Sequence, residues 1–372
     1  MAVADVESLS FRRPDGSRVE WEVEMARVPV EETRKFRTRY ASYRRFPLAI
    51  RYAIGGEDAE FALENAIATG LRMLRRFDAD RALPWEENPR RYPWELSRLV
   101  GFDVDCESPF LITVEFGSSL AGLRSTGTAG VLSSPDDLRA FASGLARGLV
   151  MLDRLGVVHR QVRANTVHWD ARSRTVQINR FEYAQRVGEA RRRLAPAHVR
   201  KPEERTARDW EAAEQILGGG LVDPRDDVFS VGCAILSVTA RGLQLGPGGV
   251  PDVAASGVPF LADMLRGVFA PVAHRPNAAE LLGRLGGSIA PQDLPQAEPD
   301  RLVEGRAEYD RITASKNPHW SAFASRPMPA EPPPPEPPSP ALSESGAGAG
   351  PSATAGSPQP GRRARRPRRG RR

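Results

Sequence analysis

The chain is poor in cysteine and has no long apolar run, and each shortage excludes a class of protein. Its 372 residues include two cysteines, Cys106 and Cys233, without C-x-x-C spacing or clustered histidines. This spacing argues against a disulfide framework and a metal centre, and it fits a reducing compartment. No apolar run approaches the roughly 18 residues of a membrane span, and the start MAVADVESLS does not resemble a signal peptide. We therefore expect a cytoplasmic protein without a transmembrane segment.

Lysine is scarce as well, and the basic charge is concentrated at one end. Only three of the 53 basic residues are lysines, and eight arginines fall within the last eleven residues. Residues 1–361 carry 45 basic and 47 acidic groups, so the pI of about 9.7 describes the C-terminal end alone. The eight terminal arginines predict nonspecific binding to nucleic acid or to an anionic surface. They are Arg362, Arg363, Arg365, Arg366, Arg368, Arg369, Arg371 and Arg372.

Composition also predicts where the folded part ends. Nine prolines lie between Pro327 and Pro340, and a Ser/Gly/Ala stretch and the arginine run follow. Such a segment cannot bury enough apolar surface to fold, so residues 323–372 are predicted to be a disordered tail, with polyproline II in its first part. A short helix at Asp300–Ile312 is expected in a partly ordered extension, residues 291–322.

The remaining residues change character partway along the chain. Up to about residue 117, strand-like runs at Val19–Met25, Leu48–Ile54 and Phe110–Phe116 surround one helical stretch at Glu57–Phe77. This predicts a small β-rich unit with one helix. From Ser134 onward helices dominate. We expect three elements there: a helix from an N-cap at Ser134 to Gly156, a strand pair at Thr166–Trp169 and Val176–Ile178, and a helix at Asp227–Ala240.

Several short motifs in this order resemble those of protein kinases. The fragments are Leu48–Arg51 with Glu64, His159–Val162 with Thr166, Ile178–Ala184, Ala212–Glu214, Asp226–Gly232, and Arg275–Pro276 with Glu280–Leu282. They are similar to V-A-I-K with its helix glutamate, H-R-D-L-x-x-x-N, D-F-G, A-P-E, the start of the central helix and the last helix. The resemblance implies an α+β fold with two lobes: a small β-rich lobe at residues 1–117 and a larger helical lobe at 118–290.

The residues that differ from these motifs are those that perform the chemistry. Gln161 stands where the family has its catalytic carboxylate, and Thr166 where it has the metal-binding asparagine. Arg180 replaces the metal-binding aspartate, and Arg51 replaces the lysine. No glycine-rich loop precedes Arg51. Since phosphoryl transfer depends on these groups, the resemblance implies a pseudokinase without functional catalytic residues and without a metal site.

Two interpretations of the cationic residues stay open. Arg51, Glu64 and Arg180 could form a cleft that binds a nucleotide, ATP without Mg²⁺, or another anion. Alternatively, Arg51 pairs with Glu64, and Arg180 pairs with Glu64 or Glu182, so that no cofactor is required.

Other motif residues are expected to be structural. These include His159 with Arg160, the pair Glu214 and Arg275, and Asp227 at the start of its helix.

The functional hypothesis is a scaffold or regulator that binds protein partners through its folded lobes and its proline-rich tail. An active Ser/Thr kinase with atypical residues and a polyanion-binding protein are the alternatives.

Overall fold

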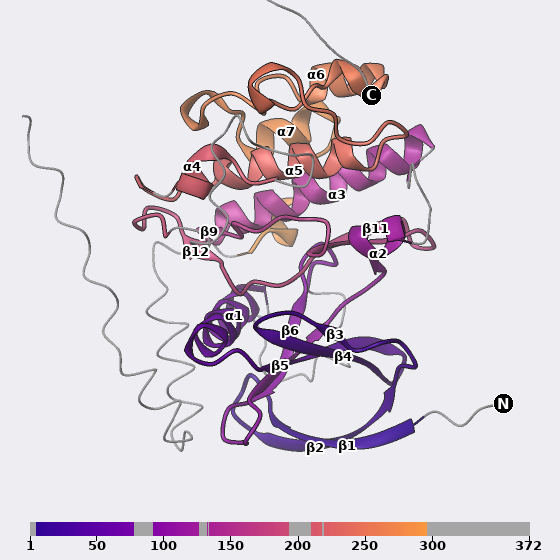
Figure 1. Cartoon of the computed structure of the whole chain (residues 1–372), viewed down its shortest axis with the longest axis vertical. Helices are drawn as coiled ribbons and strands as arrows, with labels where there is room; N and C mark the ends of the chain where they lie inside the picture. Colours follow the sequence, from indigo (N-terminus) through magenta and orange to yellow (C-terminus); the bar gives the residue numbers. More distant parts are fainter. Residues whose placement is uncertain are drawn as a thin grey trace, which may run out of the picture. The chain divides into compact units, whose positions relative to one another are not determined.

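The computed structural model describes residues 5–77, 92–125, 132, 134–192, 210–217 and 219–295. Strands dominate the first part of the chain, as Figure 1 shows. These elements are β1 (Asp5–Arg12), β2 (Arg18–Met25), β3 (Glu31–Glu32), β4 (Phe36–Tyr43), β5 (Phe46–Ala53), α1 (Glu57–Phe77), β6 (Arg98–Asp103) and β7 (Phe110–Val114).

Six of these strands close into an antiparallel barrel. The strands are hydrogen-bonded in the order β2-β1-β6-β7-β5-β4, and an additional pairing of β2 with β4 completes the ring. The pairings of β1 with β6 and of β2 with β4 are short. Arg12 opposite Phe102 is the one residue pair between β1 and β6, and two residue pairs join β2 to β4. Strand β3 extends the sheet beyond β4.

The barrel follows from a period-two pattern in its strands. In β2, Trp21, Val23 and Met25 are buried, and the glutamates between them are exposed. Inward-facing apolar side chains of five other strands meet them and fill the interior. The buried members are Phe11, Trp21, Val23, Met25, Ala41, Leu48, Ile50, Val100, Phe110, Ile112 and Val114. Gly101 leaves room for one of them, because a Cβ there would lie 2.2 Å from Phe11 Cδ2.

This barrel shows that the predicted bilobal protein-kinase-like fold is wrong. The expectation was a small sheet with a single helix, built mainly from the runs at Val19–Met25, Leu48–Ile54 and Phe110–Phe116. The structure instead uses β1, β4 and β6 as well, and it closes the sheet on itself. The prediction of a pseudokinase depended on that fold, so it is wrong as well.

The second part of the chain is mostly helical, and its predicted elements are confirmed. Ser134 caps α3 by accepting a hydrogen bond from the Asp136 backbone N–H, and Pro135 occupies the first turn. Asn277 and Glu280 form a capping box at the start of α7. The helices and longer strands are α2 (Leu120–Ser125), α3 (Pro135–Arg154), β10 (Val167–Asp170), β11 (Thr175–Ile178), α4 (Ala213–Leu217), α5 (Arg225–Ser237), α6 (Pro259–Met264) and α7 (Ala278–Arg284).

Short elements connect them, and one apolar core joins α1 to the helical part. The two-residue strands are β8 (Ser118–Ser119), β9 (Val157–Val158) and β12 (Gln185–Arg186). The 3₁₀ helices are η4 (Pro247–Gly249), η5 (Ala254–Ser256), η6 (Val272–His274) and η7 (Pro291–Asp293).

Some predictions fall outside the described residues. These are the helix at Asp300–Ile312, the tail at residues 323–372 with its eight arginines, and most of the extension at 291–322. Within the described ranges, no helix combines the length and apolarity needed to cross a bilayer.

Candidate functional site

Five charged side chains gather where the barrel meets the strands that follow α3, and we call them the junction cluster. They come from four separate parts of the chain: Glu31 on β3, Arg51 on β5, Glu115 after β7, and Arg180 and Glu182 after β11. Four of the five are buried, and Glu31 lies at the edge.

Arg51 is at the centre of the cluster. Its Nη2 donates to Glu115 Oε1, and both side chains are only 2% exposed. Glu182 Oε1 lies 3.8 Å from Arg51 Nε and adds a second carboxylate. Thr113 Oγ1 donates to the same Glu115 oxygen at 3.1 Å. Arg51 is therefore a buried cation whose charge is balanced by carboxylates of the chain itself.

Arg180 connects the strand pair β10–β11 to the barrel. Its Nη2 donates to Glu31 Oε2 at 2.6 Å, and the Tyr40 hydroxyl donates to the same oxygen at 3.0 Å. Arg180 has a φ of +69°, a left-handed conformation that costs energy in a residue with a side chain. The ion pair holds this conformation in place.

The pKa values within the cluster reflect mutual stabilisation of the charges. Burial is the largest influence on Glu115 and would raise its pKa, but Arg51 and the other cationic side chains around it together hold that pKa below its usual 4.5. Burial likewise opposes ionisation of Glu31, and the hydrogen bond from Arg180 lowers its pKa. Burial would lower the pKa of Arg180, yet Glu115 and Glu31 raise it. All three groups are therefore charged at neutral pH.

The junction cluster has little space and no surplus positive charge. The cavity beside Arg51 and Arg180 measures about 10 Å³, which is about the room that one water molecule needs. Two guanidinium groups face three carboxylates, so the formal charge is negative. Burial lowers the pKa of the neighbouring His168, so that its imidazole adds no positive charge at neutral pH. A cluster of this kind repels an anionic ligand.

The structure brings together some of the predicted site residues with partners other than those expected. Arg51 pairs with Glu115 and Glu182, whereas the sequence suggested Glu64. Glu64 is buried on α1. Arg180 pairs with Glu31, a residue that sequence reasoning did not select. No pattern within one element indicated Glu31, because its position depends on the pairing of β3 with β4.

The two other predicted positions stabilise a loop. Thr166 Oγ1 donates to the Gln161 carbonyl at 2.7 Å and accepts from the Arg163 N–H at 2.8 Å. Gln161 donates its backbone N–H to His159 Nδ1 at 3.2 Å. These bonds close the turn between Gln161 and Thr166.

Asp227 organises the segment before that turn. It accepts backbone N–H groups of His159 at 2.5 Å and Arg160 at 2.8 Å. Burial raises the pKa of Asp227 to about 7. His159 Nε2 lies 2.8 Å from the Asn179 carbonyl, and burial lowers the pKa of the ring to about 4. The imidazole is therefore neutral at physiological pH, with Nε2 donating.

The predicted pair of Arg275 and Glu214 is present, and Arg275 also donates to the Ala270 carbonyl at 2.7 Å. Both cysteines are free thiols. Burial raises the pKa of Cys106 to about 11, so its thiol is protonated and a weak nucleophile.

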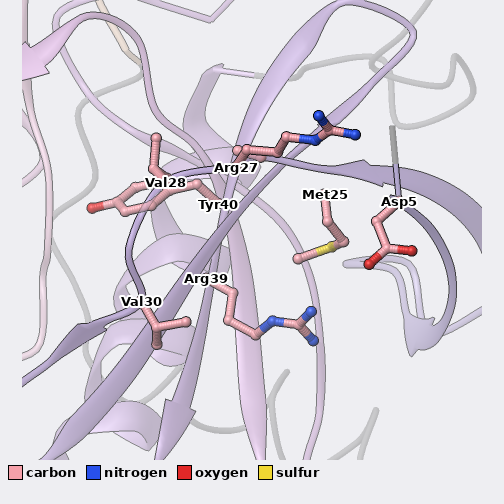
Figure 2. A pocket seen from close by; sticks show the side chains of 8 residues that line it. Asp5, Met25, Arg27, Val28, Val30, Arg39 and Tyr40 are labelled. Atoms are coloured by element: carbon pink, nitrogen blue, oxygen red, sulfur yellow. The ribbon is translucent and has the colours of Figure 1, made fainter. Parts of the chain in front are cut away.

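A second feature is an open pocket where β2 leaves the barrel, and we call it the β2–β4 pocket. Its volume is about 440 Å³, within the range of sites that bind small molecules or peptide side chains. Figure 2 shows Asp5, Met25 and Arg39 on one side of it and Val28, Val30 and Tyr40 on the other. Val28 is 52% exposed and Val30 49%.

The charge in this pocket is partly neutralised. Arg39 donates to both carboxylate oxygens of Glu7, one of them at 2.8 Å. This hydrogen bond lowers the pKa of Glu7. The pocket lining therefore combines the apolar side chains of Met25, Val28 and Val30 with the charged side chains of Asp5, Arg27 and Arg39.

No protein-family model and no curated protein matches the chain. Within the described ranges, no three His, Cys, Asp or Glu side chains gather as ligands of a metal ion.

Proposed function

We propose that the protein is a non-enzymatic scaffold or regulator that acts by binding other proteins. One observation carries this proposal: the buried arginines at the predicted ligand site, Arg51 and Arg180, are neutralised by carboxylates of the same chain. A nucleotide would have to displace those carboxylates and enter a cavity of about 10 Å³. The junction cluster thus acts as a structural connection, and neither ATP nor a metal is needed for it.

The β2–β4 pocket is the surface that we propose for partner binding. Val28 and Val30 are both about half exposed in the segment between β2 and β3, and both line the concave surface of the pocket. Exposed apolar side chains beside charged ones at a concave surface are typical of protein-binding sites. An extended peptide with apolar residues at alternate positions would fit this surface.

Calorimetric titration tests the first half of the proposal. The full chain is titrated with ATP, with and without Mg²⁺, beside an Arg180→Met variant as the matched control. We expect the same baseline heat in every case. Heat that disappears in Arg180→Met would show that the cluster accepts nucleotides and would overturn the proposal.

Selection from a displayed peptide library on the immobilised full chain tests the second half. We expect enriched peptides to bind the wild type and to lose binding to a Val28→Asp/Val30→Asp variant. The control is Leu221→Asp, which changes another exposed apolar residue, 62% accessible, outside this pocket. Absence of enrichment, or equal binding to the pocket variant, would refute the assignment of this surface.

A further inference from the structure

Strand β1 has an unpaired backbone edge. On one side it pairs with β2 along its whole length, from Asp5 opposite Met25 to Arg12 opposite Arg18. On its other side the described part of the chain provides one pairing, Arg12 with Phe102. Figure 1 shows β1 and β2 as the wall of the barrel farthest from α3 and α5. No other described element covers this edge.

The register identifies the backbone groups that are free. Arg13 donates its N–H to the Ser17 carbonyl, so its backbone faces β2. Because these groups alternate along an antiparallel strand, the even-numbered residues of β1 face away from β2. Val6, Ser8 and Ser10 therefore present their N–H and C=O groups outward, and all three residues are exposed.

This edge lacks the features that normally prevent strands from pairing. Sheet edges are commonly protected by lysine, proline or a bulge. The outward row of β1 carries none of these, and its side chains are Val6, Ser8 and Ser10, with Val6 54% exposed. Glu7 points to the other face, where Arg39 neutralises it. Backbone pairing is thus open to another strand.

We propose that this edge pairs with the same edge of a second copy of the chain, antiparallel, with Ser8 opposite the partner's Ser8. This inference goes beyond the proposed function and does not depend on it. The register matches three outward residues, with Val6 opposite the partner's Ser10, and forms about six hydrogen bonds.

Charge selects this register. Glu7 lies opposite the partner's Leu9 in it, whereas a shift of two residues toward the N-terminus places Glu7 against the partner's Glu7. A shift the other way opposes Val6 to the partner's Arg12, whose edge is already paired with Phe102. The exposed glutamates of β2, Glu20, Glu22 and Glu24, do not prevent this pairing, because β2 and its copy would be three strand spacings apart. That distance of about 14 Å exceeds the Debye length of about 8 Å at physiological salt.

Light scattering and sedimentation of the full chain at high salt test the proposal. We expect twice the chain mass of 40.7 kDa for the wild type and for Ser8→Thr. Ser8→Pro should be monomeric, because proline removes an outward N–H and leaves the bonds to β2 intact. Circular dichroism confirms that this variant is folded. A monomeric wild type, or a Ser8→Pro variant that stays dimeric, would overturn the proposal.

Disulfide trapping tests the register independently of that variant. In the proposed register the Cα atoms of Ser8 and the partner's Ser8 are about 5.5 Å apart, within disulfide range. Ser8→Cys should therefore form a covalent dimer under oxidising conditions, above the level that the native thiols give in the wild type. Ser10→Cys should not, because its copy lies four residues away along the strand, about 13 Å. Equal trapping at both positions, or trapping at Ser10→Cys alone, would refute this register.

Discussion

Removing Arg51 should destabilise the protein more than any other single change in the junction cluster. The Arg51 and Glu115 side chains are each 2% exposed. Arg51→Met keeps most of the side-chain volume but leaves a buried carboxylate without its main partner. Breaking a buried pair in this way costs about 3–5 kcal/mol. Urea unfolding, followed by tryptophan fluorescence, measures this loss as a lower midpoint with an unchanged slope.

Arg180→Met is the matched control, because it removes the other buried guanidinium. Its partner Glu31 is 37% exposed and can recover contact with water. We therefore expect a smaller loss of about 1–2 kcal/mol, between the values for exposed and buried pairs. The double variant Arg51→Met/Glu115→Gln removes the stranded charge as well, and it should regain about 1–3 kcal/mol relative to Arg51→Met.

The difference between wild type and Arg51→Met should depend on pH. The folded-state pKa of Glu115 lies below its usual 4.5. The stabilisation is then fully present above the unfolded-state pKa and is lost as the pH falls through the lower folded-state pKa. An Arg180→Met loss as large as that of Arg51→Met, or no gain in the double variant, would refute the reasoning.

Local signals in the sequence predicted α1, α3 and the strands β2, β5 and β7, but they missed β1, β4 and β6. The apolar spacing of Glu57–Phe77 gave α1 with its exact bounds, and the Ser134–Pro135 pair located the start of α3. Each signal lies within one element, so no knowledge of distant contacts was needed. The alternating pattern of β2 was readable for the same reason.

Closure of the barrel could not be read in this way. It depends on pairings such as Met25 with Ala41 and Arg12 with Phe102, which join segments with no local signal for each other. The resemblance to kinase motifs predicted a bilobal fold in place of these long-range pairings, and that prediction was wrong. The bonds that Asp227 accepts from the backbone N–H groups of His159 and Arg160 give a structural reason for an acidic residue at position 227.

For the candidate site, too, the sequence identified individual residues but not their partners. Arg51 and Arg180 were selected through the kinase resemblance, because they stand where that family has its lysine and its metal-binding aspartate. Their partners were misassigned, because the contacts of Arg51 with Glu115 and of Arg180 with Glu31 join residues that are far apart in the chain. The resemblance favoured Glu64, because it stands on α1 where the helix glutamate of that family pairs with the lysine.

Three further predictions follow from single residues or segments. The contribution of the neutral, buried His159 to the free energy of unfolding should decrease as the pH falls from about 6.5 to about 4, because the unfolded chain then binds a proton that the folded chain does not. NMR titration of the ring should give the low pKa, and a value near 6.5 would contradict the geometry. Gly101→Ala should destabilise the barrel by about 1–3 kcal/mol, since its Cβ would collide with Phe11, whereas Gly283→Ala, with open space around it, should be neutral or stabilising in thermal unfolding. Finally, the run Arg362–Arg372 should bind duplex nucleic acid without sequence preference, because eight arginines separated only by alanine, proline and glycine bring charge but no fixed geometry for reading bases. If four to eight phosphates are contacted, log K should fall with log salt at a slope of about −4 to −7. Truncation after residue 361 should abolish this binding and leave the melting temperature unchanged, since the run has no large apolar side chain to pack into a core. A shallow salt slope, or binding that survives the truncation, would place polyanion recognition elsewhere in the chain.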